Sequence, residues 1–216
     1  MSMKPIPFNT DMVRALLENR KTVARRVVKP QPKYCAMSKA GLLTSDSPIK
    51  TVDGIIHAAN ATLLKPSYQP GNILYVQETW ARPNAAEIAA GTNPNTYLYA
   101  ADAPLLPAAY DKWRSSSHMP KEAARIFLRV TGVRIERLQD ITTDEIIKEA
   151  DKIACINEKG EEVPYSTKFE ALLRVCFGEF WDSTIKPADR TIYGWAANPW
   201  VWVIEFERCE KPKVNP

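Results

Sequence analysis

Hydrophobic and polar positions alternate along several stretches of the chain, which is the pattern of half-buried β-strands. The clearest alternation covers residues 73–80 and 125–138, and residues 21–29 carry a shorter run of the same kind. Gly132 interrupts the longest run and predicts a bulge or a sharp bend there. Residues 199–206 begin apolar on both faces, as expected of a strand inside a closed barrel or beneath a helix.

A helical spacing of apolar positions occurs in other stretches. Residues 10–20 predict a short amphipathic helix that Asn9 can cap and that Asn19 can end in a turn. Residues 166–181 predict a longer helix, and residues 140–145 combine a threonine with early acidic residues, as at a helix N-terminus. Several short strands with two or three helices, and no βαβ alternation, indicate an α+β fold around a small barrel.

Turn-forming and weakly patterned stretches separate these elements. Residues 69–72 are a strong turn signal. Residues 33–70 are weakly patterned and predict only two short strands, at 49–56 and 61–65. The stretch of about 81–120 is rich in Ala, Pro and Asn, and an insertion of this length either covers a site or merely decorates the fold. We therefore expect a single domain over residues 4–210 that contains this insertion, followed by a flexible tail at 211–216.

The composition is that of an ordinary globular chain. Of its 216 residues, 45% are hydrophobic and 25% are charged, and the formal net charge is +4. A charge this small is compatible with a nucleic-acid partner but does not require one. No apolar stretch approaches the ~20 residues of a membrane helix, and the first ten residues lack the apolar run of a secretory signal. We therefore expect a cytoplasmic protein without a membrane partner.

Several classes of chemistry lack their usual residues. The four cysteines form no Cys-x-x-Cys pair and the two histidines lie far apart in the sequence. We therefore expect reduced thiols, no metal site and no histidine-based triad. The eight glycines form neither a Gly-x-Gly-x-x-Gly turn nor a P-loop, which argues against nucleotide-driven enzymes of those kinds, and no cofactor is expected.

Lys21, Arg25 and Arg26 form a cationic cluster after the first predicted helix. In an extended segment Lys21 and Arg25 share one face, and Arg26 lies on the other. The cluster is either a solvated basic strand that favours the C-terminus of the preceding helix or a rim that binds an anion or a phosphate. Both interpretations stay open at this point.

Glu78 lies on the same strand face as Leu74, Val76 and Trp80. If that face is internal, the carboxylate needs a cation nearby, because an unpaired buried carboxylate costs several kcal/mol or becomes protonated. The candidates are the three cations of the 21–26 segment. The pair is either a structural salt bridge or a cleft acid with a shifted pKa.

The chain has six tryptophans, which raises the question of base stacking. The four near the C-terminus lie within helix or strand patterns, where packing in the core is the better explanation. Trp80 lies beside Glu78 at the start of the insertion and is the best candidate for a stacking platform, and Trp113 is a weaker one.

Two segments resemble motifs of a known family. Residues 19–26 (Asn-Arg-Lys-Thr-Val-Ala-Arg-Arg) resemble the Gly-Arg-Lys-Thr-x-Thr-x-Arg signature of ASCH domains. Residues 69–80 are similar to the Pro-Gly-Asp-x-Leu-x-Val-x-Glu-Thr-Trp pattern of phage and prophage members, and residues 138–150 and 199–207 also fit those sequences. The resemblance implies a PUA-like β-barrel flanked by helices, with a cleft beside the first helix and an RNA-related ligand.

One ASCH branch deacetylates N4-acetylcytidine with a lysine, a threonine three residues later and a glutamate in the helix after the long strand. Lys21 and Glu149 match the first and third positions, but Ala24 stands at the threonine position. A methyl group cannot act as a nucleophile or donate a hydrogen bond. A metal-free amidohydrolase acting on an N4-acylated cytidine would therefore need Lys21 to activate water and Glu149 to pass the proton to the leaving amine.

The leading hypothesis is a binding module for RNA or a modified nucleoside. In it Lys21, Arg25 and Arg26 contact a phosphate or a base edge, Trp80 stacks on the base, and Glu78 accepts a hydrogen bond from its amino group. The amidohydrolase is the main alternative, and a ribonuclease is a more distant one. A further alternative is a phage interaction protein with a vestigial cleft, whose proline-rich loops bind a host factor.

Overall fold

A computed structural model describes residues 3–38, 41–45, 50–52, 55–57, 62–103, 105–149 and 167–212 of the chain. The helices are α1 (Thr10–Leu17), α2 (Ala85–Ala89), α3 (Thr143–Glu149), α4 (Thr167–Thr184) and α5 (Arg190–Tyr193). The strands are β1 (Lys4–Pro7), β2 (Val23–Val27), β3 (Tyr34–Ser38), β4 (Gly41–Ser45), β5 (Lys50–Val52), β6 (Ile55–His57), β7 (Thr62–Leu64), β8 (Ile73–Gln77), β9 (Trp80–Ala81), β10 (Leu98–Tyr99), β11 (Phe127–Arg137) and β12 (Trp200–Cys209). This mixture of helices and multi-stranded sheet is an α+β fold, as the sequence predicted.

The chain divides into two compact units, each assembled from separate segments. Unit 1 comprises residues 1–22, 70–131 and 206–216, and unit 2 comprises residues 23–69 and 132–205. Strands β11 and β12 contribute residues to both units. The single domain expected over residues 4–210 stays a prediction, and residues 213–216 of the expected tail lie outside the described residues.

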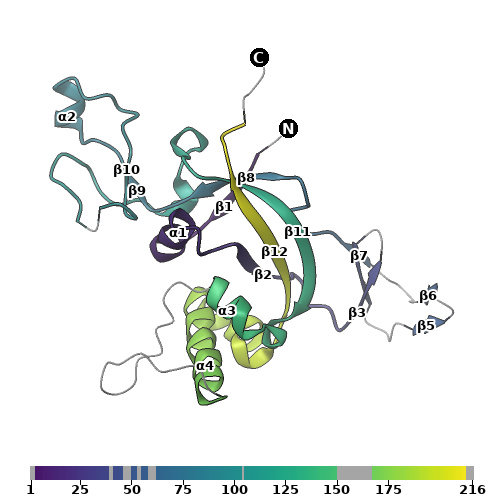
Figure 1. The fold of residues 1–216 in the computed structure, drawn as a ribbon. Coiled ribbons are helices and arrows are strands. Elements are labelled where there is room, and N and C mark those ends of the chain that lie inside the picture. Colours follow the sequence, from purple (N-terminus) through teal and green to yellow (C-terminus); the bar gives the residue numbers. More distant parts are fainter. Residues whose placement is uncertain are drawn as a thin grey trace. The chain divides into compact units, whose positions relative to one another are not determined.

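The largest sheet has the strand order β1-β8-β11-β12-β2 (Figure 1). In unit 1, β1 runs parallel to β8, and β8 pairs antiparallel with the first residues of β11. In unit 2, β12 runs antiparallel to β2, with Trp202 opposite Arg26 and Ile204 opposite Ala24. Strand β11 corresponds to the strand predicted over residues 125–138, and β12 corresponds to the one predicted over residues 199–206.

Helix α1 in unit 1 follows its sequence signals closely. The Asn9 side chain accepts a hydrogen bond from the backbone N–H of Met12 at 2.8 Å, which satisfies one of the free amides of the first turn. Val13 and Leu16 are buried. Asn19 ends the helix in the left-handed region, with φ of 57°.

The single strand predicted over residues 73–80 is two strands in the structure. Strand β8 ends at Gln77, and the backbone N–H of the next residue, Glu78, donates to Sδ of Met119 at 3.2 Å. Strand β9 then begins at Trp80, whose N–H donates to the carbonyl of Arg114 at 3.2 Å. The chain leaves the main sheet here because its next backbone partners belong to the insertion.

The 81–120 insertion is fastened to the rest of unit 1 through its turn at residues 99–103. Arg14 of α1 donates to the carbonyls of Ala100 and Ala101 at 3.3 and 3.1 Å. The hydroxyl of Tyr99 donates to the carbonyl of Ala123 at 2.6 Å. This part of the insertion therefore has fixed anchor points on α1 and on the segment before β11.

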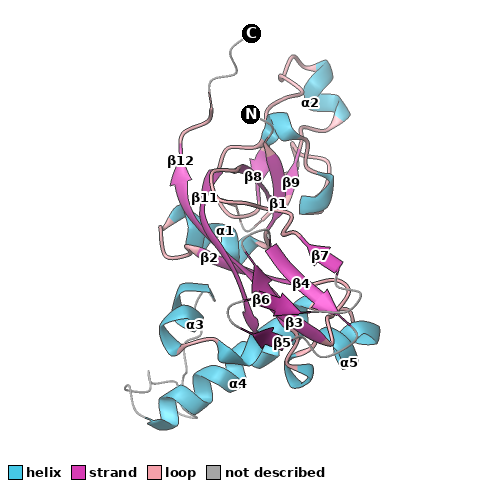
Figure 2. Ribbon diagram, turned by 90° about the vertical axis from the view of Figure 1, so that its right-hand side faces the viewer, coloured by secondary structure: helices cyan, strands magenta, loops and turns pink. Residues whose placement is uncertain are grey.

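Unit 2 packs its helices around an apolar core. Helix α3 packs on α4, as Figure 2 shows. The core consists of buried residues from α3 and α4, from β2 and β12, and from the segment between β11 and α3: Val23, Leu138, Ile141, Ile146, Leu173, Phe177, Trp181, Val201 and Val203. The weakly patterned stretch before residue 69 forms the β3-β4-β7 sheet and the β5-β6 hairpin, of which β3 and β4 had no clear signal in the sequence. No helix in the described ranges is both long enough and apolar enough to cross a membrane.

Gly178 of α4 is a close packing point in this core. A Cβ at this position would lie 2.9 Å from the Trp195 ring, which is itself held edge-on against Phe177. We expect Gly178→Leu to lower the free energy of unfolding by about 1–3 kcal/mol through overpacking, although leucine is the better helix former by about 1 kcal/mol. Urea unfolding of this variant and of Val175→Leu, an exposed position on α4, tests the expectation. A stabilised Gly178→Leu variant would contradict it.

Candidate functional site

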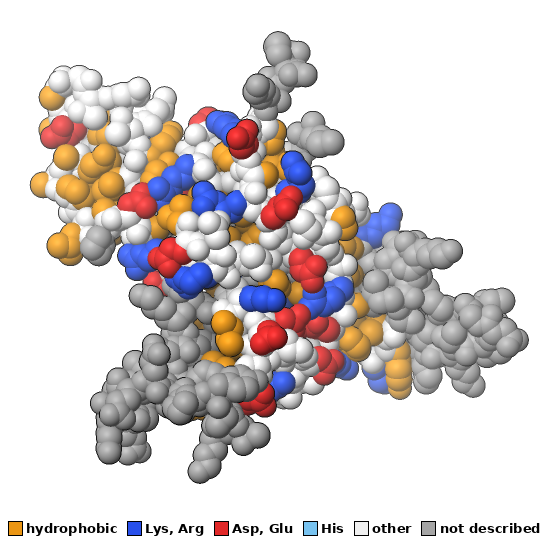
Figure 3. Space-filling model, in the orientation of Figure 1, with side chains coloured by type: hydrophobic (Ala, Val, Ile, Leu, Met, Phe, Trp, Pro, Cys, Tyr) orange, Lys and Arg blue, Asp and Glu red, His pale blue; other side chains and the backbone are white. Residues whose placement is uncertain are grey.

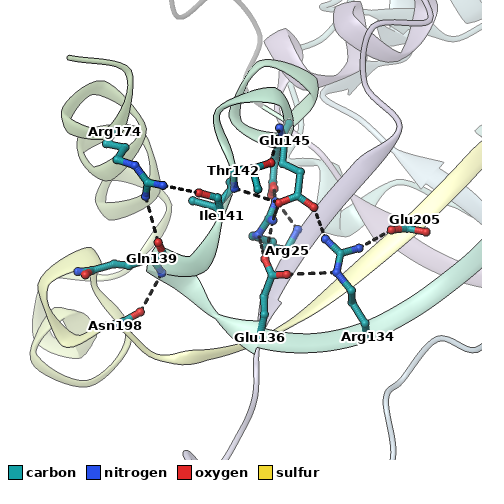
Figure 4. A network of polar contacts seen from close by, with 11 residues as sticks. Arg25, Arg134, Glu136, Gln139, Ile141, Thr142, Glu145, Arg174, Asn198 and Glu205 are labelled. Carbon is teal, nitrogen blue, oxygen red and sulfur yellow. Dashed lines mark hydrogen bonds and ion pairs between the residues drawn. The ribbon is translucent and has the colours of Figure 1, made fainter. Parts of the chain in front are cut away.

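Arg25 of β2 lies at the centre of a buried ionic network in unit 2. Its guanidinium is fully buried and contacts Glu136 at 2.5 Å and Glu145 at 2.9 Å (Figure 4). It also contacts Glu149. The backbone N–H of Arg25 also donates to Glu149, at 2.8 Å. Both carboxylate oxygens of Glu149 therefore accept hydrogen bonds from the same residue.

Arg134 of β11 extends this network by contacting Glu136, Glu145 and Glu205. Glu145 also closes a capping box at the start of α3, in which its N–H donates to Thr142 and its carboxylate accepts from the N–H of Thr142. Partial burial opposes ionisation of Glu145, but the Thr142 N–H and the two arginines lower its pKa below the ordinary value. Burial likewise opposes the charge of Arg25, yet Glu149 and Glu136 raise its pKa. The network thus favours the charged forms of Arg25 and Glu145.

Backbone contacts hold the segment before α3 in place. Arg174 of α4 donates to the carbonyls of Gln139 and Ile141 at 3.0 and 2.9 Å, and the Asn198 side chain accepts from the N–H of Gln139 at 2.8 Å. These bonds appear together in Figure 4. They position the start of α3, and with it the glutamates that surround Arg25.

Glu78 in unit 1 is buried, as its strand face predicted, with 1% of its surface exposed. Its cation is Arg125, which contacts the two carboxylate oxygens at 2.9 Å each and was not among the three candidates. The other edge of the guanidinium contacts Asp102 of the insertion, and its face lies 4.0 Å from the ring centroid of Tyr99. Burial raises the pKa of Glu78 despite this pairing, and burial together with Glu78 raises the pKa of Tyr99 to about 12.

Trp80 is part of the core of unit 1, with 2% of its surface exposed. Tyr97 packs edge-on against it at 5.6 Å, and the guanidinium groups of Arg82 and Arg114 each lie 5.6 Å from its ring. A buried ring held in this way offers no open surface to a base, so stacking on Trp80 would require these neighbours to move.

Lys21 is also buried in unit 1, with its ammonium 5.6 Å from the ring centroid of Phe8. Of the predicted site residues, the structure brings Arg25 and Glu149 together in unit 2, as partners of each other. Glu78 is held by Arg125 in unit 1. Arg26, the last of the predicted site residues, lies on the opposite face of β2 from Arg25.

Arg26 lines a cavity of about 340 Å³ in unit 2. Two further cations, Lys29 and Lys65, share this cavity with the aromatic rings of Tyr68 and Trp202. The remaining lining residues are Val27, Pro66, Ser67 and Ile204, so none of the lining residues that the structure describes is acidic. The cavity therefore combines three positive side chains with two aromatic ones.

Most of this cavity has no direct signal in the sequence. Trp202 lies directly opposite Arg26 in the β2-β12 pairing, and this register cannot be derived from either strand alone. Burial lowers the pKa of Arg26, but a guanidinium stays protonated in any case. The ammonium of Lys29 lies 4.7 Å from the ring centroid of Tyr193, and this cation–π contact holds the side chain in place.

Within the described residues, no group of three or more His, Cys, Asp or Glu side chains is arranged to hold a metal ion. The likeness to ASCH domains rests on sequence motifs such as those at residues 19–26 and 69–80, and it stays an expectation. The chain matches no protein-family model, no curated protein and no solved structure.

Proposed function

We propose that the protein is a nucleic-acid-binding module that takes an RNA nucleotide in the cavity lined by Arg26, Lys29, Lys65, Tyr68 and Trp202. A single observation carries the proposal: three cations and two aromatic rings line one hollow whose described lining contains no carboxylate. The PUA-like barrel implied by the sequence motifs is part of the same proposal.

The lining suits the two halves of a nucleotide. Arg26 contributes a guanidinium, whose Nη1 donates to the carbonyl of Arg25 at 3.0 Å, and Lys29 and Lys65 contribute ammonium groups. Three positive charges in one lining suit a phosphate. Trp202 and Tyr68 are half-buried, and stacking of a base on an aromatic ring contributes about 1–3 kcal/mol. The volume of about 340 Å³ is at the lower end of the range for small-ligand pockets, about 300–1,000 Å³.

The charge of the cavity differs from that of much of the surface. On the face drawn in Figure 3, acidic and basic side chains are intermixed. A mixed surface of this kind has little preference for anions, because neighbouring charges cancel within a Debye length of about 8–10 Å. Three cations without an acid in one concave lining are therefore a local feature that favours a phosphate.

The amidohydrolase alternative has less support. Ala24 is buried and offers only a methyl group at the position where a threonine would be expected. Glu149 already accepts hydrogen bonds from Arg25 through both carboxylate oxygens, so proton transfer through it would have to break at least one of them. Binding without chemistry is the simpler function for these residues.

Fluorescence anisotropy with a labelled single-stranded RNA tests the proposal. We expect Arg26→Gln to weaken binding about 10-fold, or about 1.4 kcal/mol, and to make the salt dependence shallower by about one phosphate contact. Lys148→Gln is the matched control, because it removes one positive charge from an exposed position of α3 in the same unit. No binding by the wild type at low salt, or equal losses in the two variants, would overturn the proposal.

A further inference from the structure

A second cavity of about 230 Å³ lies in unit 2. Its lining includes one cation, Lys33, and the three hydroxyl groups of Thr44, Ser45 and Thr62. As in the first cavity, the lining residues that are described include no acidic side chain. Lys33 is exposed, so its ammonium is accessible from solvent. This second cavity is smaller than the first one.

The linings of the two cavities have no residue in common, but they meet at two chain segments. Lys29 lines the first cavity, and Pro30, the next residue in the chain, lines the second. On a different segment, Leu64 lines the second cavity, and the adjacent Lys65 lines the first. Because consecutive Cα atoms are about 3.8 Å apart, the cavities are neighbours on both segments. This proximity on two separate segments suits a ligand that contacts both cavities.

Gln31 holds the first of these two segments in place. Its side-chain amide donates to the carbonyls of Val28 and Trp200 at 2.8 and 3.0 Å, and its oxygen accepts from the N–H of Trp200 at 2.8 Å. The loop after β2 is thus bonded to the start of β12 before any ligand arrives. Such preorganisation lowers the entropy lost on binding.

We propose that the two cavities are consecutive subsites for a single-stranded RNA of at least two nucleotides. This inference rests on the proposed function and extends its ligand from a single RNA nucleotide to an oligonucleotide. In the second subsite Lys33 provides a contact for a phosphate. The hydroxyl of Thr44 donates to the carbonyl of Thr62 at 3.2 Å, which leaves its oxygen to accept from a ribose 2′-OH.

Binding of ligands of increasing length tests the inference. The probes are uridine, uridine 5′-monophosphate and oligouridylates of two and four nucleotides, titrated against the wild type by calorimetry. We expect affinity to rise about 10-fold or more from the monophosphate to the tetranucleotide, because a second phosphate and sugar come into contact. Lys33→Gln and Lys33→Gln/Thr44→Val should remove most of this gain and leave binding of the monophosphate unchanged. The single variant changes an exposed side chain only, so it keeps the test valid if the double variant folds poorly.

The outcomes separate this inference from the proposed function. If the monophosphate binds and Arg26→Gln weakens it, but added nucleotides bring no gain, the second subsite is wrong and the first one stands. A length gain that survives both Lys33 variants overturns the assignment of the second cavity. A failure of every probe to bind overturns the proposed function, and the inference with it.

Discussion

Replacing Arg25 with methionine is expected to lower the free energy of unfolding by about 3–5 kcal/mol, the usual cost of leaving buried charges without their partner. The substitution keeps a long side chain but removes the one cation that Glu136, Glu145 and Glu149 share. Glu149 is affected most, because it is buried and accepts hydrogen bonds from Arg25 through both carboxylate oxygens. Urea unfolding monitored by tryptophan fluorescence measures the change.

Arg134→Met is the matched control for this measurement. Arg134 contacts two of the same glutamates, but 37% of its side chain is exposed, so solvent screens its ion pairs. We expect a loss of about 1 kcal/mol or less for this variant. Adding Glu149→Gln to Arg25→Met should restore part of the stability, because it removes the most buried of the stranded charges. Equal losses of unfolding free energy in the two arginine variants would show that burial of Arg25 does not increase its contribution to stability.

Successive side chains of β2 lie on opposite faces of the strand, so two neighbouring arginines have different roles, one in stability and one in binding. Arg25 points into the ionic network, whereas Arg26 lines the cavity on the other face of the strand. A variant at Arg26 should therefore change affinity with little change in stability, and a variant at Arg25 should do the reverse. This contrast also explains why two adjacent arginines in one strand need not serve one site.

Elements with strong local signals could be predicted from the sequence. Asn9 as a cap and Asn19 as a left-handed terminator depend only on nearby backbone groups, and both have these roles in α1. Gly71 adopts φ of 85° in the turn expected before β8. Strands β3 and β4 were missed because they are short and are stabilised by pairing with each other and with β7.

The candidate site was harder to predict because it depends on contacts between distant segments. Burial of Glu78 followed from its strand face, but its partner Arg125 is 47 positions away and lies just before β11. Trp202 was assigned to the core, since nothing in β12 indicates which residue of β2 it faces. A slip of one residue in that register would move Trp202 to the opposite face from Arg26.

Replacing Arg125 with methionine is expected to destabilise the protein in a pH-dependent way. Glu78 has a raised pKa in the folded state even with Arg125 present, because its carboxylate is buried. The folded state therefore binds this proton more tightly than the unfolded state does, and stability falls as the pH rises from the unfolded pKa through the folded one. Loss of the cation raises the folded pKa of Glu78 further and extends that fall to higher pH.

We therefore expect Arg125→Met to cost about 3–5 kcal/mol at about pH 8, where Glu78 would be a buried charge without its partner. The cost should be clearly smaller at about pH 5, because a protonated Glu78 needs no cation. Loss of the exposed Asp102 contact adds little at either pH. Urea unfolding at the two pH values, repeated with Arg125→Met/Glu78→Gln, isolates the effect, since the double variant should lose the pH dependence. A cost that is the same at both pH values, or larger in acid, would mean that Arg125 stabilises unit 1 through packing on Tyr99 and not through the charge of Glu78.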